Sequence, residues 1–341
     1  MATPMQYSVA FDCGKEEFAA AILLQNNEQS TVVKATRKFS NTLRGFSESE
    51  QWIERHKKFD LPVRITMEAT GNYHEHLAFY FHQKAFRLSI VLPNKAKKYL
   101  QSLGQKSKND KLDSIGLAKM GAQQNLFAWQ PFSSSIYELR TLTRYYEQLS
   151  QHRTQLRNQL SSLRYNQYRM QEVEDRLSVL IKEIEKQLSE IKDKIEDAIK
   201  KDDKLNQRAD NVLSIKGIGM LTVATVIAET NGFQLFDNQR QLCSYAGYDV
   251  VENQSGKRNG KTKISKKGNS HIRRIMYMPA LNVVRCQNPK FVAMYERIMS
   301  RNTKKMVAYT AIQRKLLVLI YTLWTKNEKY SPDYKIAERI L

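Results

Sequence analysis

The first part of the chain alternates short runs of β-forming residues with segments of helical spacing. Three β-rich runs come first, and a polar turn between the second and third is typical of a hairpin. The expected strands are 7–12, 18–24, 31–39, 63–68 and 86–93, and the expected helices are 46–56, 73–84 and 94–103. This order predicts a mixed α/β sheet with antiparallel leading strands and parallel crossovers.

The middle of the chain is helical throughout, because residues 136–199 contain neither proline nor glycine. Two runs of apolar positions alternate steps of four and three over three heptads each, with Lys and Glu outside, which is typical of a coiled coil. The polar stretch 164–175 fits either a continuous weak section or the bend of an antiparallel hairpin. Packing within one chain and an intermolecular coiled coil both stay open. The runs are Leu142, Tyr146, Leu149, Arg153, Leu156, Leu160 and Leu163, then Leu177, Ile181, Ile184, Leu188, Ile191, Ile195 and Ala198.

Residues 211–224 predict a helix, a tight turn through Gly217 and Gly219, and a second helix. The pattern is similar to a helix-hairpin-helix element, whose turn amides and helix N-terminus hold a phosphate without reading sequence. Gly-x-Gly between helices is also a common tight turn. Residues 291–299 and 307–324 then have the spacing of amphipathic helices that close this last region.

The net charge indicates what kind of partner the protein binds. The hydrophobic content of 41% is that of a folded globular protein, but 55 Lys and Arg against 34 Asp and Glu give +21. Fourteen Lys or Arg and only two acids occupy residues 252–305. Neutralising even six phosphates makes binding fall about 10³-fold between 50 and 200 mM salt. A polyanion, and nucleic acid in particular, is the expected partner.

Several other classes are disfavoured. No apolar run is expected to reach the 18 residues of a membrane span, and residues 1–6 lack the features of a signal peptide. Cys13, Cys243 and Cys286 lie far apart and are read as reduced packing residues, not as a zinc site or a disulfide frame. We therefore expect a cytoplasmic protein, associated with the nucleoid when active and without a membrane partner.

Four carboxylates suggest a metal site. Asp12 and Glu68 each end an expected strand, and Asp110 and Asp113 lie at i,i+3 on one face of an expected helix. Each alone has an ordinary reading as a turn or capping residue. The element order, however, resembles the RNase H-like fold of nucleases, integrases and junction resolvases, in which the first and fourth strands are neighbours. Four carboxylates gathered at one sheet edge can hold two Mg²⁺ ions about 3.5–4 Å apart.

Three sequence blocks make the resemblance more specific. Asp12-Cys13-Gly14-Lys15, Glu68-Ala69-Thr70-Gly71-Asn72-Tyr73 and Asn109-Asp110-Lys111-Leu112-Asp113 resemble the D-x-x-K, E-A-T-G-x-Y and D-x-x-D blocks of the insertion-sequence "one-ten" family. That family of DEDD transposases includes pilin-gene invertases and recombinases guided by a bridge RNA. The resemblance implies an RNase H-like (RuvC-like) domain at 1–130, coiled-coil helices at 131–205 and a helical C-terminal transposase domain at 206–341.

The C-terminal domain contains a candidate nucleophile. Ser255-Gly256 in a Gly/Asn-rich loop is ordinarily a turn. Followed by the Ile-Ser-Lys-x-Gly-Asn block at 264–269 and Arg273-Arg274, it resembles the family's transposase domain, which implies that Ser255 is the nucleophile. The loop after it departs from the Arg-Gly ending of some members, so Ser265 and Ser270 stay as alternatives. The nearby His271 is expected to contact phosphate.

The resemblance implies an enzyme that cuts and rejoins DNA strands through a transient phosphoserine. Asp12, Glu68, Asp110 and Asp113 would be catalytic and would hold two Mg²⁺ ions, or Mn²⁺. A structured bridge RNA would select double-stranded donor and target DNA, and the coiled coil would form a homodimer or tetramer. The expected nucleic-acid contacts are Lys15, Lys216, Gly217, Gly219, Lys257, Arg258, Lys261, Lys263, Lys266, Lys267, Arg273 and Arg274.

Two other functions stay open at this point. The first is a metal-dependent endonuclease or Holliday-junction resolvase in which the carboxylates activate water and Ser255 is only a turn residue. The second is a non-catalytic nucleic-acid-binding protein whose acidic residues merely cap helices.

Overall fold

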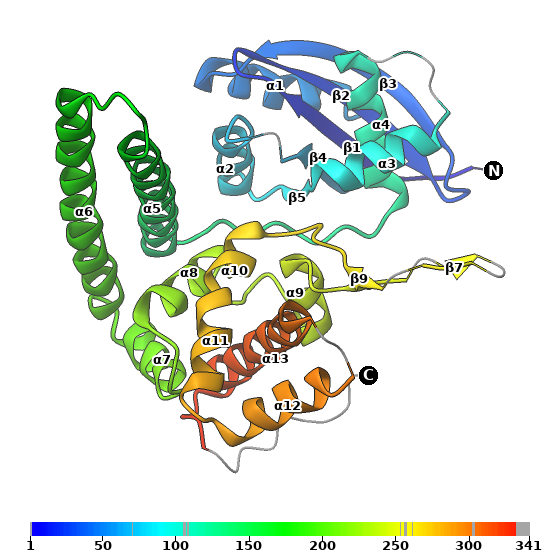
Figure 1. Cartoon of the computed structure of the whole chain (residues 1–341). Coiled ribbons are helices and arrows are strands. Elements are labelled where there is room, and N and C mark those ends of the chain that lie inside the picture. The colour runs from blue at the N-terminus through cyan, green and yellow to red at the C-terminus, as the bar shows by residue number, and fades with distance from the viewer. Residues whose placement is uncertain are drawn as a thin grey trace. The chain divides into compact units, whose positions relative to one another are not determined.

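The chain packs into two compact units, Met1–Pro131 and Phe132–Leu341 (Figure 1). The three domains expected from the sequence are a finer division than this split, since the long middle helices belong to the second unit. The computed structural model describes residues 2–69, 71–104, 107, 109–252, 254–255, 258–260, 262–301 and 304–331.

The first unit contains a five-stranded sheet in the order β3-β2-β1-β4-β5. The pairs β1/β2 and β2/β3 are antiparallel, whereas β1/β4 and β4/β5 are parallel. The mixed α/β sheet and the adjacency of the first and fourth strands are therefore confirmed. The strands are β1 (Pro4–Cys13), β2 (Glu17–Asn26), β3 (Thr31–Ser40), β4 (Val63–Glu68) and β5 (Arg87–Val91).

Helices cover both faces of this sheet because side chains alternate along each strand. Phe11 and its odd-numbered neighbours in β1 pack against α1 and α2, whereas Ala10 packs with Leu117 and Ala118 of α4. A Cβ on Gly121 would lie 2.2 Å from Oγ1 of Thr66, so α4 approaches the sheet closely. The helices of this unit are α1 (Leu43–His56), α2 (Glu75–Gln83), α3 (Pro93–Ser102) and α4 (Asp110–Gln123).

The second unit begins with two long helices, α5 (Ser134–Arg164) and α6 (Gln171–Lys200), that pack on each other as an antiparallel hairpin (Figure 1). Leu160 of α5 is buried with Leu177 and Ile181 of α6. The Tyr145 hydroxyl donates to Gln187 at 3.0 Å, and Arg157 pairs with Glu185. The apolar seams therefore meet within one chain, which was the hairpin alternative, and a coiled coil between chains stays a prediction.

The remaining helices pack around α13 (Lys305–Lys326). Among the described residues, α13 is the one helix long and apolar enough to cross a membrane, so the expectation that no run reaches this length was wrong. In the structure Leu316, Leu319 and Ile320 are fully buried, and α13 packs as the core helix of its unit. The other helices are α7 (Asp203–Leu213), α8 (Met220–Thr230), α9 (Gln239–Ala246), α10 (Ser270–Ile275), α11 (Tyr277–Arg285) and α12 (Pro289–Met299).

The three cysteines are free thiols in different environments. Cys13 and Cys243 are buried packing residues as expected, and burial together with the Asp12 charge raises the pKa of Cys13 to about 12. Cys286 is exposed, so the expectation of a packing role was wrong for that residue.

Candidate active site and nucleic-acid interface

Two of the four predicted carboxylates lie side by side on the sheet. Phe11 of β1 pairs with Met67 of β4, so Asp12 and Glu68 occupy the next position on neighbouring parallel strands. Parallel strands are about 4.8 Å apart, and residues at matching positions project to the same face. That face is the one covered by α4, because the Ser8 hydroxyl donates to the Ala118 carbonyl at 2.7 Å.

The first turn of α4 lies toward the same end of the sheet. The helix runs antiparallel to β1, because Ala122 accepts from Gln6 and Ala118 accepts from Ser8. From Ser8 to Asp12 the strand rises about 13 Å. From Ala118 back to Asp110 the helix spans about 12 Å. Asp110 and Asp113 are therefore placed near the two strand-end carboxylates.

The cap of α4 explains where this helix begins. The Asn109 side chain accepts from the Leu112 amide at 2.9 Å, so Asn109 is the N-cap residue. Asp110 and Asp113 are thereby left in the first turn without serving as the cap.

A lysine that the sequence analysis missed belongs to the same site. Lys38 of β3 pairs with Ala19 of β2, which pairs with Asp12, so Lys38 lies in one row with the acidic residues. Its ammonium donates to Asp110 at 2.9 Å and also contacts Glu17. These hydrogen bonds raise the pKa of Lys38, and the bond from Lys38 lowers the pKa of Asp110. Only the sheet register could have revealed this lysine.

The donor set suits a hard divalent cation, because carboxylate oxygens are the ligands that Mg²⁺ and Mn²⁺ prefer. The Lys38 ammonium already shows that a cation is accommodated at Asp110. Among the described residues, however, no three His, Cys, Asp or Glu side chains are close enough to form a metal site as they stand. The carboxylates fit a metal by their chemistry, but among the described residues they are not assembled into a chelate. The four-carboxylate metal site therefore stays a prediction.

Ser255 lies on a β-arm in the second unit, which we define as the described residues between 250 and 264 (Figure 1). At its base β6 (Val250–Val251) pairs with β9 (Lys263–Ile264), and further out β7 (Gln254–Ser255) pairs with β8 (Arg258–Asn259). The backbone of Ser255 is thus held opposite Arg258 in an antiparallel pair. The side chains of Ser255 and Arg258 lie outside the described residues, as do Lys257 and Lys261.

The Ile-Ser-Lys-x-Gly-Asn block joins the β-arm to the helices. A Cβ on Gly268 would lie 2.3 Å from the Tyr245 carbonyl, so only glycine fits this close contact. The Asn269 side chain caps α10 by accepting from His271, and its amide donates to Glu229 at 2.6 Å. The Ser265 hydroxyl donates to the Gly247 carbonyl. The described side chains of this block therefore have structural roles.

Glu229 on α8 is the centre of a buried ion pair that the sequence analysis missed. Its side chain is 0% exposed, and Arg144 of α5 donates to both carboxylate oxygens at 2.7 and 3.0 Å. Burial raises the pKa of Glu229, but the hydrogen bond and charge of Arg144, with Asn269 and Arg140, outweigh it and hold the pKa below its ordinary value. This network links the hairpin to α8 and α10.

Replacing Glu229 with glutamine is expected to destabilise the protein by about 3 kcal/mol, because the neighbouring arginines lose a buried counter-charge. Urea unfolding at pH 7 measures the loss. Because the folded pKa is depressed, the stabilisation is present above the ordinary pKa near 4.5 and is lost as pH falls through the folded value. The control is Glu172→Gln. Glu172 and its partner Arg176 are both exposed, so this variant should lose less than about 1 kcal/mol of stability. Equal losses of stability in the two variants would contradict the role of Glu229 as a buried counter-charge.

Some predicted nucleic-acid contacts are engaged within the chain. Arg273 donates to the Ala246 carbonyl at 2.7 Å, and both Arg274 and His271 contact Glu147 of α5. The sequence separation between Glu147 and His271 hid this carboxylate–histidine pair from sequence analysis. The exposed lysines among the predicted contacts are Lys15, Lys216, Lys263, Lys266 and Lys267.

The Gly-x-Gly turn between α7 and α8 has two different glycines. Gly217 adopts φ +103°, and a Cβ there would lie 3.0 Å from the Val283 amide of α11. Gly219 is the N-cap of α8, and a Cβ added there would meet open space. The predicted helix, turn and helix are present, and Gly219 leaves the helix N-terminus open to an approaching anion. Phosphate binding there stays a prediction.

Comparison with known proteins extends these observations. A family model described as "Transposase IS116/IS110/IS902 family" matches residues 209–296, and a DEDD transposase model of the IS110 type matches residues 9–163. The chain is 29% identical over 335 residues to the pilin gene-inverting protein of Moraxella bovis, covering 97% of this chain and 98% of that protein. The corresponding protein of Moraxella lacunata matches with the same identity and coverage.

A transposase of Coxiella burnetii, for insertion sequence element IS1111A, is 24% identical over 297 residues, 78% of this chain and 79% of that protein. Among solved structures, Thermus thermophilus RuvC matches with 10% identity and a TM-score of 0.24, over 33% of this chain and 91% of that chain.

The acidic residues at the strand ends of the first unit lie within one matched transposase model, and most of the basic segment 252–305 lies within the other. The protein is thus a DNA transposase, an enzyme that cleaves and rejoins DNA strands. More particularly, the chain belongs to the IS110 family of transposases. Membership of an enzyme family removes the non-catalytic alternative.

Proposed function

We propose that this transposase is a site-specific recombinase that joins DNA strands through a transient phosphoserine at Ser255. The observation that carries the proposal is the row of Asp12 and Glu68 with the first turn of α4, a set of acidic groups at one sheet edge of a DNA-acting enzyme. A lone strand-end carboxylate is an ordinary turn residue, but an acidic row suits phosphoryl transfer.

Asp12, Glu68, Asp110 and Asp113 would hold Mg²⁺, or Mn²⁺ in its place. When bound, the ion would stabilise the charge that develops on the phosphorus oxygens and the leaving oxygen. Lys38 adds a positive charge beside Asp110 that would attract the scissile phosphate, which the carboxylates alone would repel. Exposed lysines of the second unit hold the flanking phosphates by charge.

Ser255 would form a bond from its hydroxyl oxygen to the phosphorus while the bond to one sugar oxygen breaks. The serine proton passes to solvent, and the departing sugar oxygen takes a proton. The phosphodiester is conserved as a serine ester, so a sugar hydroxyl of the partner strand can attack it, release Ser255 and seal the new junction. No external energy source is needed, since one ester replaces another at each step.

The partners we propose are double-stranded donor and target DNA, a structured guide RNA and further copies of the chain. The charge of +21 supplies a surface that can hold both nucleic acids. The pilin gene-inverting relatives support a DNA-inverting or transposing reaction. A dimer or tetramer would form through the α5/α6 hairpin, on which Val179 and Leu180 of α6 are exposed.

A second candidate is a metal-dependent endonuclease or junction resolvase. It is favoured by one observation, that all four carboxylates belong to the first unit while Ser255 belongs to the second. In that case the acidic residues would activate a water molecule and Ser255 would be a turn residue.

A denaturing gel of labelled DNA distinguishes the recombinase from the endonuclease. The proposal expects a protein-linked DNA band that requires a divalent metal and disappears with a chelator. Adding the candidate guide RNA should direct the band to one DNA sequence. Free cleavage products without a protein-linked band would favour the endonuclease.

Replacing Lys38 with methionine is expected to raise the affinity for Mn²⁺ by up to about fivefold, because an exposed ion pair of this kind contributes up to about 1 kcal/mol and would no longer compete at Asp110. Calorimetric titration of the free protein measures the affinity without any reaction. The control is Lys34→Met on the same strand, which removes an equal charge and should leave the affinity unchanged. An unchanged or weaker affinity in the Lys38 variant would contradict this role.

A further inference from the structure

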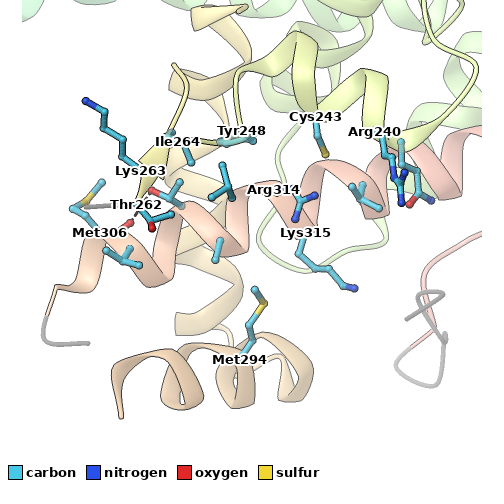
Figure 2. Close-up of a pocket in the computed structure, with 16 residues that line it drawn as sticks. Arg240, Cys243, Tyr248, Thr262, Lys263, Ile264, Met294, Met306, Arg314 and Lys315 are labelled. Atoms are coloured by element: carbon cyan, nitrogen blue, oxygen red, sulfur yellow. Dashed lines mark hydrogen bonds between the residues drawn. The ribbon is translucent and has the colours of Figure 1, made fainter. Parts of the chain in front are cut away.

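The second unit contains a cavity of about 480 Å³ at the base of the β-arm. Figure 2 shows side chains reaching it from four directions. Cys243 comes from α9, Met294 from α12, Met306 from α13, and Ile264 from β9. Its volume is in the range of sites that hold one small organic ligand, about 300–1,000 Å³.

Among the residues that the structure describes, the charged side chains that line this cavity all have one sign. Arg240, Lys263, Arg314 and Lys315 line it, and the 16 lining residues include no Asp or Glu. The Nε atom of Arg314 is buried without a hydrogen-bond partner. A buried donor without a hydrogen-bond partner is destabilising, and an anionic oxygen would satisfy it. The cavity therefore suits a ligand that has an anionic group.

The cavity also suits the rest of such a ligand. Val250 and Met294 give it apolar walls on which a flat ring can lie. A nucleotide combines these properties, with a base for the apolar walls and a phosphate for Arg314. A base inside a duplex is stacked on both sides, so only an unstacked nucleotide could enter.

The position of the cavity connects it with DNA strands. Val250, Lys263 and Ile264 of the β-arm base line it, and three residues after Val251 the strand β7 begins and leads to Ser255. A strand that has one nucleotide in the cavity is thereby held beside the segment that carries the candidate nucleophile.

We propose that this cavity binds one unstacked nucleotide of a DNA strand, with the base against the apolar wall at Met294 and the phosphate at Arg314. The inference rests on the proposed function for its use in strand transfer. Binding of the nucleotide requires neither metal nor the Ser255 hydroxyl, so a binding measurement without metal tests the cavity independently of the proposed reaction.

The experiment measures binding of the full chain to two DNA duplexes without metal. One is continuous, and the other has a single 2-aminopurine nucleotide bulged from one strand. We expect about tenfold tighter binding of the bulged duplex, together with a change in 2-aminopurine fluorescence. Ala311→Phe fills the cavity and Arg314→Met removes the phosphate partner. Each should abolish the preference and leave the affinity for the continuous duplex within about twofold.

The matched control is Arg297→Met, an exposed residue of α12 outside the cavity, which should lower both affinities equally and keep the preference. A preference that survives in both cavity variants would overturn the proposal. So would stronger binding of a bulged RNA duplex, or binding of a free deoxynucleoside monophosphate with no preference for the bulge. A change of oligomeric state in the cavity variants, without any change in DNA binding, would assign the cavity to a second copy of the chain and would also overturn it.

Discussion

Replacing Ser255 with alanine is expected to abolish DNA cleavage and the protein-linked DNA band together, lowering the rate by about 10⁴-fold or more. The reason is that alanine lacks the hydroxyl oxygen that forms the ester with the DNA phosphorus. Ser255 is held opposite Arg258 in the β7/β8 pair, and alanine preserves this backbone pairing. The variant should therefore bind DNA as the natural protein does.

The measurement is single-turnover cleavage of end-labelled DNA, resolved on a denaturing gel. Ser265→Ala is the matched control, since its hydroxyl donates to the Gly247 carbonyl and its loss should leave a protein-linked band. Ser270→Ala tests the remaining alternative nucleophile. Cleavage that persists in the Ser255 variant and gives free products would contradict the recombinase proposal and favour an endonuclease that activates water.

Replacing Asp12 with asparagine is expected to lower strand cleavage by about 10³-fold while leaving the fold intact. Asparagine has the same shape but lacks the charge that a divalent ion requires of its ligands. Asp12 lies beside Glu68 in the row across the sheet, so its loss removes a central member of the acidic set. Affinity for Mn²⁺ should fall in parallel, which a purely structural role would not cause.

Rates at several Mg²⁺ and Mn²⁺ concentrations show whether excess metal restores part of the activity. Glu28→Gln is the control, because Glu28 is an exposed acid in the turn between β2 and β3, at the other end of these strands. Thermal unfolding should be unchanged in both variants. Full cleavage by the Asp12 variant would remove the acidic row from the mechanism.

Local patterns were sufficient for most of the elements. The strands expected at 7–12 and 63–68 both exist because alternation and β-branched residues act over a few positions. The second ends on Glu68 as expected, whereas β1 continues one residue past Asp12 to Cys13. The start of α4 could likewise be read from Asn109 and the acidic residues after it. The family blocks then selected these carboxylates from 34 acidic residues.

Contacts between distant residues could not be read in this way. Lys38 joins the acidic row only through the register of β3 on β2 and β2 on β1. Glu229 meets Arg144 across 85 positions, and Glu147 meets His271 across 124. Nothing in the neighbouring sequence marks these partners, because the charges pair only after the helices have packed.

The sequence by itself determined the mixed sheet, the long helices, the basic surface and the family, because these depend on periodicity, composition and short motifs. The tertiary structure decided that α5 and α6 pack within one chain, that α13 is buried in a core and that a cationic cavity lies below the β-arm. The physical reason is that helical periodicity shows which face is apolar, whereas the partner of that face depends on the loops and on the packing of all the other elements.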